Sequence, residues 1–293
     1  MILLKLNTAV AALAATATAG VVRRDADSAQ VVSPNQLQLL SLYEQFSAAA
    51  AGNCPTVEQH GATVEFLFLN EGDSDVTGFI AVDNDPLNPS IVLAFRGVRS
   101  IETGLTKLNT RLVPNAACGA GCEVHEGFQK AWDSVAASIT RQLTAIQAVT
   151  TLNRLVITGH GVGGALATLA ALQYRTATSL IPGIPATSVQ LYTYGSPRVG
   201  NRIFALSITG GTTNVRVTHI DDPIPKFPST NLGYVQWGPE FWIRSPTGQP
   251  VHTVDIDPVI PAGIENSNGN SGTPPSLNIP AHLWYFNNVV ACI

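Results

Sequence analysis

The chain has 293 residues, of which 45% are hydrophobic and 12% charged, which is enough apolar material for a substantial core and excludes disorder as its main state. Its formal charge is −4, from 16 basic and 20 acidic residues. This balance excludes the basic footprint of a nucleic-acid-binding protein, so we expect no nucleic-acid partner. The length fits one α/β domain of up to about 300 residues.

The N-terminal segment has the pattern of a secreted protein. Residues 1–19 combine an early lysine, an apolar stretch and the small-residue sequence Ala17-Thr18-Ala19, which is typical of a signal peptide. The apolar run is shorter than the roughly 20 residues that a membrane-spanning helix needs. Residues 20–24 end in Arg23-Arg24 and fit a short pro-segment with a dibasic processing site, although two solvated arginines are the alternative. We therefore expect an extracellular protein whose domain spans 25–293.

Four cysteines make an even count, which in a secreted chain favours two disulfides among three possible pairings. Cys118 and Cys122 flank a flexible Gly-Ala-Gly loop and could close a small ring, which would leave Cys54 to pair with Cys292. A zinc site is the competing interpretation. It is disfavoured because no second close cysteine pair or suitably spaced histidine accompanies Cys118 and Cys122.

Hydrophobic periodicity predicts the elements in chain order. Leucine and aromatic residues at helical spacing predict an amphipathic helix over 35–50. Helix and strand patterns alternate from residue 127 onward, which predicts an α/β domain with parallel strands. Residues 245–280 are rich in Pro, Gly, Asn and Ser, so we expect a long surface loop system there. The predicted strands are 63–69, 78–82, 91–95, 155–157, 189–194 and 215–220, and the later helices are 128–146, 163–172 and 201–207.

One predicted strand-to-helix junction carries a glycine-rich turn, Gly159-His160-Gly161-Val162-Gly163. In a G-x-S-x-G nucleophile elbow, a sharp turn between strand and helix exposes a serine hydroxyl above the sheet. Here the central position is Gly161, so the elbow pattern is complete except for the serine. A phosphate cradle at the helix N-terminus is the alternative, but the turn lacks a P-loop lysine and a G-x-G-x-x-G start.

Five motifs in a fixed order resemble the fungal class 3 lipase family, which includes mould triacylglycerol lipases and feruloyl esterases. The resemblance covers the chain from about residue 35 to its end. It implies an α/β-hydrolase fold, with a central, mostly parallel sheet flanked by helices in one domain. The Cys118–Cys122 loop resembles the feruloyl-esterase branch, and a Cys54–Cys292 bridge resembles that family's long-range bridge. The motifs are Phe95-Arg96-Gly97, residues 124–128, residues 159–167, residues 192–201 and residues 219–225.

The resemblance also implies roles for individual residues. The catalytic aspartate matches Asp222, with Asp221 as its less favoured neighbour, and the catalytic histidine matches His282, in the Ser, Asp, His chain order of this fold. The nucleophile position matches Gly161, where the family has serine. The oxyanion-hole donors match the backbone N–H groups of Val162 and Val98. No metal or organic cofactor is implied.

Two further departures from the family lie near this site. Val98 stands where the family usually has Ser or Thr, and Thr103-Gly104 stands where the lid tends to read Asn-Trp, so a lid within 99–114 would cover the site weakly. Ser196 and Thr158 are the other candidate nucleophiles. Neither is expected to meet His282, because Ser196 follows a different strand and Thr158 lies within the strand below the turn.

The sequence therefore predicts a secreted, monomeric protein of the carboxylic ester hydrolase type. Without a hydroxyl at Gly161 no acyl-enzyme can form, so we expect impaired catalysis with binding of a lipid or acyl ester and contact with a lipid interface. One alternative is an active triacylglycerol lipase or esterase, in which Gly161 is an engineered replacement or in which Asp222 and His282 activate a water. The changes at Val98 and Gly104 disfavour a single engineered replacement. A non-catalytic, partner-binding secreted protein is the other alternative.

Overall fold

The computed structural model describes residues 32–52, 61–71, 75–97, 109–176, 180–209, 213–259 and 264–289. These residues build an eight-stranded sheet with the order β1-β2-β3-β6-β7-β8-β9-β10, and a small hairpin of β4 and β5. The strands are β1 (Ala62–Glu71), β2 (Val76–Asp83), β3 (Ser90–Phe95), β4 (Leu112–Pro114), β5 (Glu123–His125), β6 (Leu155–His160), β7 (Val189–Tyr194), β8 (Asn214–His219), β9 (Glu240–Ile243) and β10 (Ile256–Val259).

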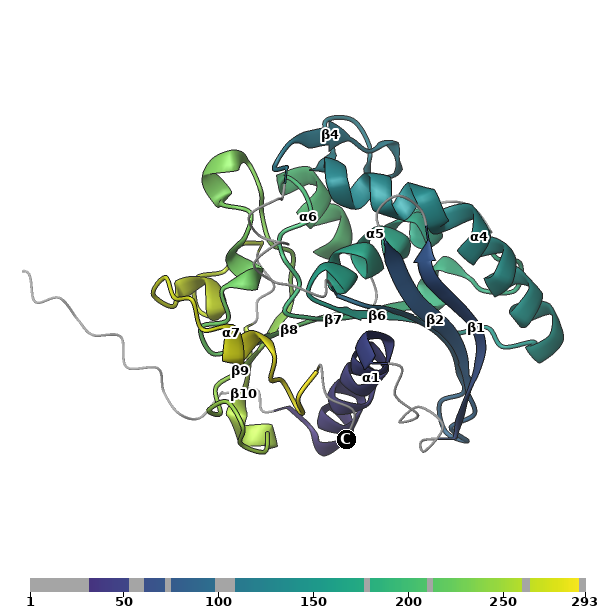
Figure 1. Cartoon of the computed structure of the whole chain (residues 1–293), viewed down its shortest axis with the longest axis horizontal. Coiled ribbons are helices and arrows are strands. Elements are labelled where there is room, and N and C mark those ends of the chain that lie inside the picture. Colours follow the sequence, from purple (N-terminus) through teal and green to yellow (C-terminus); the bar gives the residue numbers. More distant parts are fainter. Residues whose placement is uncertain are drawn as a thin grey trace, which may run out of the picture.

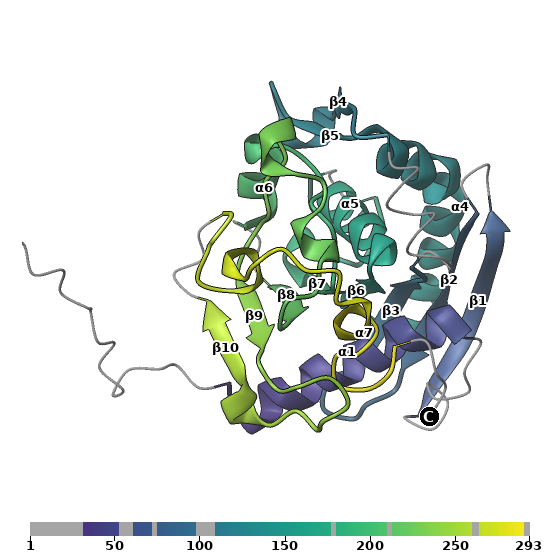
Figure 2. The same ribbon diagram turned by 60° about the vertical axis from the view of Figure 1, so that its left-hand side comes forward.

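Helices cover both faces of this sheet. In Figure 1, α1 lies on one face, and α4, α5 and α6 lie on the other. Figure 2 shows β1 and β10 at the two edges of the sheet, with α1 crossing beneath it. The helices are α1 (Pro34–Gly52), α4 (Glu126–Thr150), α5 (Val162–Thr176), α6 (Arg202–Thr209) and the short α7 (Ile279–His282).

The alternation of side chains along the central strands creates two apolar cores. Ile91, Leu93 and Phe95 of β3 pack into the core beneath α4 and α5, whereas Val92 and Ala94 face the core beneath α1. All six residues of β3 are buried, which is typical of a strand covered by helices on both faces. Burial on both faces explains why the sequence of β3 is apolar at nearly every position instead of alternating with polar residues.

The predicted fold class is confirmed, and the predicted elements all occur within a few residues of their expected bounds. Strands β3, β6, β7, β8 and β9 pair in parallel, as the alternation of elements from residue 127 predicts for that part. Strands β1 and β2 pair antiparallel at one edge. The parallel strands place their carboxyl ends at one edge of the sheet, where sites of α/β proteins form.

The loop system predicted over 245–280 contains one strand that was not predicted. Residues 256–259 form β10, which pairs antiparallel with β9, a strand that the periodicity also missed. Both strands have only four residues, and β10 contains Pro258, so neither carries a recognisable alternation. Proline is tolerated there because β10 is an edge strand, where a backbone donor can be spared.

Among the described residues, no helix is both long enough and apolar enough to span a membrane.

Candidate active site

The centre of the candidate site is a hydrogen bond between Asp222 and His282. Asp222 follows β8 in a turn closed by its own N–H, which donates to the His219 carbonyl oxygen at 2.9 Å. His282 is the last residue of α7. The His282 Nδ1 atom lies 2.9 Å from Asp222 Oδ2, and the two residues are 4% and 0% exposed. Because a carboxylate only accepts, Nδ1 donates, and the lone pair of the neutral imidazole lies on Nε2.

Further donors hold the Asp222 carboxylate in place. The Tyr285 hydroxyl donates to the same Oδ2 atom at 2.6 Å, and the Ile224 N–H donates to Oδ1 at 2.9 Å. The Asn270 side-chain amide donates to the Asp222 backbone carbonyl at 2.9 Å. Burial raises the pKa of Tyr285 well above its usual range, and the nearby Asp222 raises it further, so the phenol remains a donor. A buried carboxylate with these partners has the orienting role that a histidine base requires.

His160 supports His282 from its other side. The two rings lie with centroids 4.3 Å apart, and His160 Nε2 donates to the His282 backbone carbonyl at 2.8 Å. Burial holds the pKa of His160 well below its usual range, and the neighbouring His282 lowers it further. His160 therefore stays neutral and adds no positive charge beside the base.

Gly161 is the single residue between the end of β6 and the start of α5. Its N–H donates to the Tyr194 carbonyl at 2.9 Å, and its φ of +56° lies in the left-handed region, which suits glycine. A Cβ atom built on Gly161 would lie 3.2 Å from His282 Nε2. A side chain at this position would therefore point at the basic nitrogen of the dyad, which is the arrangement of a nucleophile elbow.

Gly195, directly after β7, lies against the other side of the dyad. A Cβ built there would lie 2.9 Å from Asp222 Oδ2, 2.9 Å from His282 Cε1 and 2.7 Å from the Tyr285 hydroxyl. A backbone without a side chain is therefore needed for the three groups to meet.

The structure brings together most of the residues that the sequence singled out. Val162, the second expected oxyanion donor, begins α5 immediately after Gly161, so its N–H belongs to the unpaired first turn of that helix. Gly97 lies against the turn, since a Cβ there would be 2.8 Å from the His160 carbonyl oxygen. Val98 itself, the lid residues 99–108, Cys54 and Cys292 lie outside the described residues.

The alternative residues are bound elsewhere. The Asp221 carboxylate accepts from the Asn278 amide at 2.7 Å. Thr158 is buried in β6, where its hydroxyl donates to the Tyr43 carbonyl at 2.9 Å, and the buried Ser196 hydroxyl donates to the Pro197 carbonyl at 3.2 Å. Tyr285 and His160 were not predicted as parts of the site. The sequence carries no signal for Tyr285, whereas His160 stands next to the turn residue and could have been considered.

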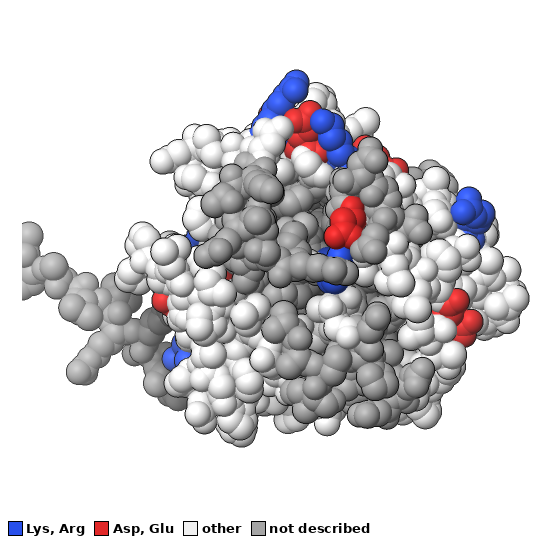
Figure 3. Space-filling model, viewed as in Figure 1, with Lys and Arg blue, Asp and Glu red and all other residues white. Residues whose placement is uncertain are grey.

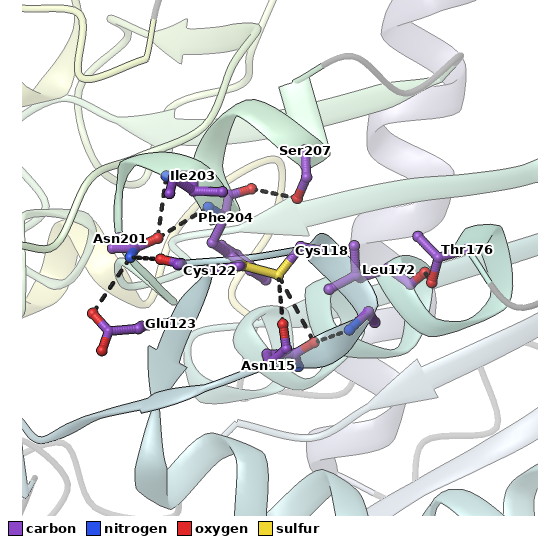
Figure 4. Close-up of a disulfide and its surroundings, with 12 residues drawn as sticks. Asn115, Cys118, Cys122, Glu123, Leu172, Thr176, Asn201, Ile203, Phe204 and Ser207 are labelled. Carbon is purple, nitrogen blue, oxygen red and sulfur yellow. Dashed lines mark hydrogen bonds between the residues drawn. A yellow bond between two sulfur atoms is a disulfide. The ribbon is translucent and has the colours of Figure 1, made fainter.

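Cys118 and Cys122 form a disulfide with a Cα–Cα distance of 5.7 Å, as expected for the small loop. Both thiols are used in this bond, so the zinc interpretation of this pair is wrong. Figure 4 shows Asn201, which precedes α6, beside this disulfide. The Asn201 side-chain amide donates to the Gly121 carbonyl at 2.8 Å and so ties the loop to that helix. In the described part of the chain, no three His, Cys, Asp or Glu side chains gather in a group that could hold a metal ion.

The face of the molecule shown in Figure 3 carries no continuous patch of one charge among the described residues. On the face shown in Figure 3, the charged side chains are scattered, and those of opposite sign alternate rather than forming one continuous patch. The chemistry available at the site is therefore that of an oriented imidazole base beside a helix N-terminus. Such a pair can accept a proton from a hydroxyl and stabilise a developing oxyanion.

Comparisons with known proteins agree with this geometry. The family model described as "Lipase (class 3)" matches residues 92–232. The secreted mono- and diacylglycerol lipase A of Penicillium cyclopium is 36% identical over 96% of this chain and 94% of its own length. The chain belongs to the class 3 lipase family. A second relative, the secreted mono- and diacylglycerol lipase 1 of Fusarium solani, is 38% identical over 83% of this chain and 69% of its own length.

A solved structure supports the same assignment at the level of the fold. The mono- and diacylglycerol lipase from Aspergillus oryzae matches with a TM-score of 0.76 and 32% identity, over 88% of this chain and 99% of that structure. The central sheet and flanking helices of this class 3 lipase family member therefore form an α/β-hydrolase fold in a single domain.

Proposed function

We propose that this protein acts on carboxylic esters of lipids, with acylglycerols as the substrate class. The observation that carries the proposal is the buried His282–Asp222 hydrogen bond, whose basic nitrogen faces the turn between β6 and α5. The Penicillium and Fusarium relatives are named mono- and diacylglycerol lipases, and these names supply the substrate class.

In this proposal Asp222 orients His282 and stabilises the imidazolium that forms when Nε2 accepts a proton. The backbone N–H of Val162 donates to the oxyanion, and the resemblance assigns the second donor to Val98. Tyr285 and His160 are positioning residues, because they contact Asp222 and His282 rather than a reacting atom.

The rate of ester hydrolysis depends on the residue at the nucleophile position, which is Gly161. Gly161 has no hydroxyl, so the protein cannot form an acyl-enzyme, and His282 must instead activate a water directly. Loss of the nucleophile costs on the order of a millionfold in serine hydrolases, although the oxyanion donors and substrate binding retain roughly a thousandfold or more over water. We therefore propose slow hydrolysis coupled to acyl-ester binding. Full lipase activity is the second candidate, and the names of the relatives favour it.

The test compares the protein with its Gly161→Ser variant on a short-chain nitrophenyl ester and on emulsified mono- and diacylglycerols. We expect slow turnover by the original protein and an increase of several orders of magnitude, up to about a millionfold, in the serine variant. If the original protein turns over rapidly and His282→Ala abolishes this activity, the proposal of impaired catalysis fails and full lipase activity takes its place. Silence of a folded Gly161→Ser variant on all substrates would overturn the assignment of the site.

We further propose that residues 1–19 are removed as a signal peptide and residues 20–24 as a pro-segment, so that the secreted domain begins near Asp25. The Penicillium and Fusarium relatives are named as secreted lipases, which supports export of this protein. Mass spectrometry of the protein purified from the medium of an expressing culture would test both cleavage sites. The same measurement after alkylation tests a Cys54–Cys292 bridge, because two disulfides leave no thiol to be modified.

A further inference from the structure

Asp221 and Asn278 form a second link between the two segments that carry the Asp222–His282 pair. Asp221 directly precedes Asp222 in the turn after β8, and Asn278 directly precedes α7, whose last residue is His282. The Asn278 side-chain amide donates to Asp221 Oδ1 at 2.7 Å. This hydrogen bond therefore joins the same two parts of the chain as the bond from His282 Nδ1 to Asp222 Oδ2.

Asn278 also holds the start of α7. Its side-chain oxygen accepts from the Ala281 N–H at 3.2 Å, which is the role of an N-cap residue. α7 has only four residues, and a single helical turn is not stable on its own because nucleation of a helix is costly. The position of this turn, and with it that of the His282 imidazole, therefore depends on contacts such as those of Asn278.

The Asp221 carboxyl has the charge that suits an acceptor. Burial raises the pKa of Asp221, but hydrogen bonds from Ser276 and Asn278 and the charge of Lys226 outweigh burial and hold the pKa below its usual range. The Ser276 hydroxyl donates to the Asp221 backbone carbonyl at 3.0 Å and accepts from the Asn278 N–H at 3.1 Å. The start of α7 is thus tied to both the side chain and the backbone of Asp221.

We propose that Asp221 and Asn278 are positioning residues, which hold the His282 imidazole where it meets the Asp222 carboxylate. This pair, the Asp221–Asn278 latch, acts through His282 and not on the substrate. Asn278 fixes the start of the helical turn, and Asp221 fixes Asn278 relative to Asp222. The inference rests on the proposed function, in which His282 is the base, because displacing a catalytic group by about 1 Å costs on the order of 100-fold in rate.

The experiment measures kcat and KM for nitrophenyl butanoate in the Gly161→Ser background. Asn278→Asp keeps an acceptor for Ala281 but replaces the donor to Asp221 by a second carboxylate. We expect kcat to fall by about 10- to 100-fold with little change in KM. Asn278→Ser keeps a capping oxygen, is too short to reach Asp221 and adds no charge, so it should also lower kcat. Asn153→Asp adds a charge at an exposed position before β6 and should leave kcat unchanged.

An exchange of the two side chains tests the contact itself. In the double variant Asp221→Asn/Asn278→Asp, the amide at position 221 can donate to the carboxylate at position 278, whose other oxygen still accepts from Ala281. The summed charge is that of the original pair. We expect this variant to recover about tenfold in kcat over Asn278→Asp, which is within the coupling expected for two residues in contact. Thermal melting of each variant separates loss of position from loss of folding.

A second measurement does not depend on ester hydrolysis. The proton on His282 Nδ1 lies in the hydrogen bond to Asp222, and its NMR resonance can be recorded on the original protein with Gly161. We expect Asn278→Asp to shift or broaden this resonance, because the imidazole is no longer held against the carboxylate. The exchanged pair should restore it.

The outcomes separate the latch from the proposed function. Unchanged kcat in folded Asn278→Asp and Asn278→Ser variants of an active Gly161→Ser protein would refute the latch. An exchanged pair that recovers its melting temperature but not kcat would also refute it, because the contact would then serve stability alone. A folded Gly161→Ser variant without activity refutes the proposed function, and the His282 resonance then decides whether the latch positions the imidazole.

Discussion

Glu44 is a buried carboxyl on α1, and its titration should make the folded protein less stable as the pH rises. The residue is 0% exposed, and burial raises its pKa to about 8, with contacts to Asn287 offsetting only part of the effect. In the unfolded chain the carboxyl ionises near its ordinary value of 4.5. Between these two values the folded protein holds a proton that the unfolded chain has released, so the free energy of unfolding falls with increasing pH.

The size of this effect follows from the interval between the two pKa values. At about 1.36 kcal/mol per pH unit, the interval from 4.5 to about 8 corresponds to a loss of about 5 kcal/mol across that range. Glu44→Gln keeps the shape of the side chain and removes its titration. We therefore expect the variant to gain several kcal/mol relative to the original protein between pH 4.5 and pH 8.

Urea unfolding at half-unit pH intervals would measure this difference. The exposed Glu65 of β1 offers a matched control, since Glu65→Gln removes the same formal charge without the burial. The difference between Glu44→Gln and the original protein should grow with pH, while that of Glu65→Gln stays nearly constant. Parallel stability curves for Glu44→Gln and the original protein would show that the folded protein does not hold the Glu44 proton across this range, and the reasoning would fail.

Two further predictions concern one side chain that caps α4 and one that contacts Asp222. His125 Nδ1 accepts from the first N–H groups of α4, and burial lowers the pKa of His125 to about 4. This stabilisation is therefore present above pH 6.5 and is lost as the pH falls toward 4, at a cost of about 3 kcal/mol. His125→Asn, which keeps a capping acceptor but does not titrate, should flatten the acid limb of the stability curve, and an unchanged limb would show that protonation of His125 does not cause the loss. In a Gly161→Ser background, Tyr285→Phe should lower kcat by about 10- to 100-fold with little change in KM. The reason is that a hydrogen bond to the Asp222 carboxylate is worth about 1.5–3 kcal/mol. If Tyr285→Phe raised KM and left kcat unchanged, Tyr285 would instead belong to substrate binding.

The fold was predictable where the strands are buried on both faces or the helices are long. β7 has continuous β-rich character, and α4 carries a long apolar stripe, so each was located from its own residues. β9 and β10 have four residues each, and their pairing depends on contacts with each other that no local pattern records. The strands beyond β8 could therefore be located only from the structure.

The site was predictable where motif order fixed the residues. Asp222, His282 and Gly161 were placed by the order of motifs along the chain, and the structure brings the three together. Tyr285 was missed because its contribution depends on the path of the chain after α7, which returns its hydroxyl to the Asp222 carboxylate. No spacing in the sequence predicts such a return.

The dyad alone does not distinguish a working hydrolase from a binding protein, because it also has a structural role. Asp222 joins the end of β8 to the C-terminal segment through both His282 and Tyr285, so replacing either partner leaves a buried carboxylate with fewer donors. A chain without catalytic use for the dyad would still lose stability if the dyad were removed. Gly161 has no such second role toward Asp222, although its φ of +56° means that a side chain there strains the backbone. Variants at Gly161 therefore leave the Asp222 hydrogen bonds in place and report on chemistry once their folding has been checked, whereas variants of Asp222 or His282 also remove the hydrogen bonds that join β8 to the C-terminal segment.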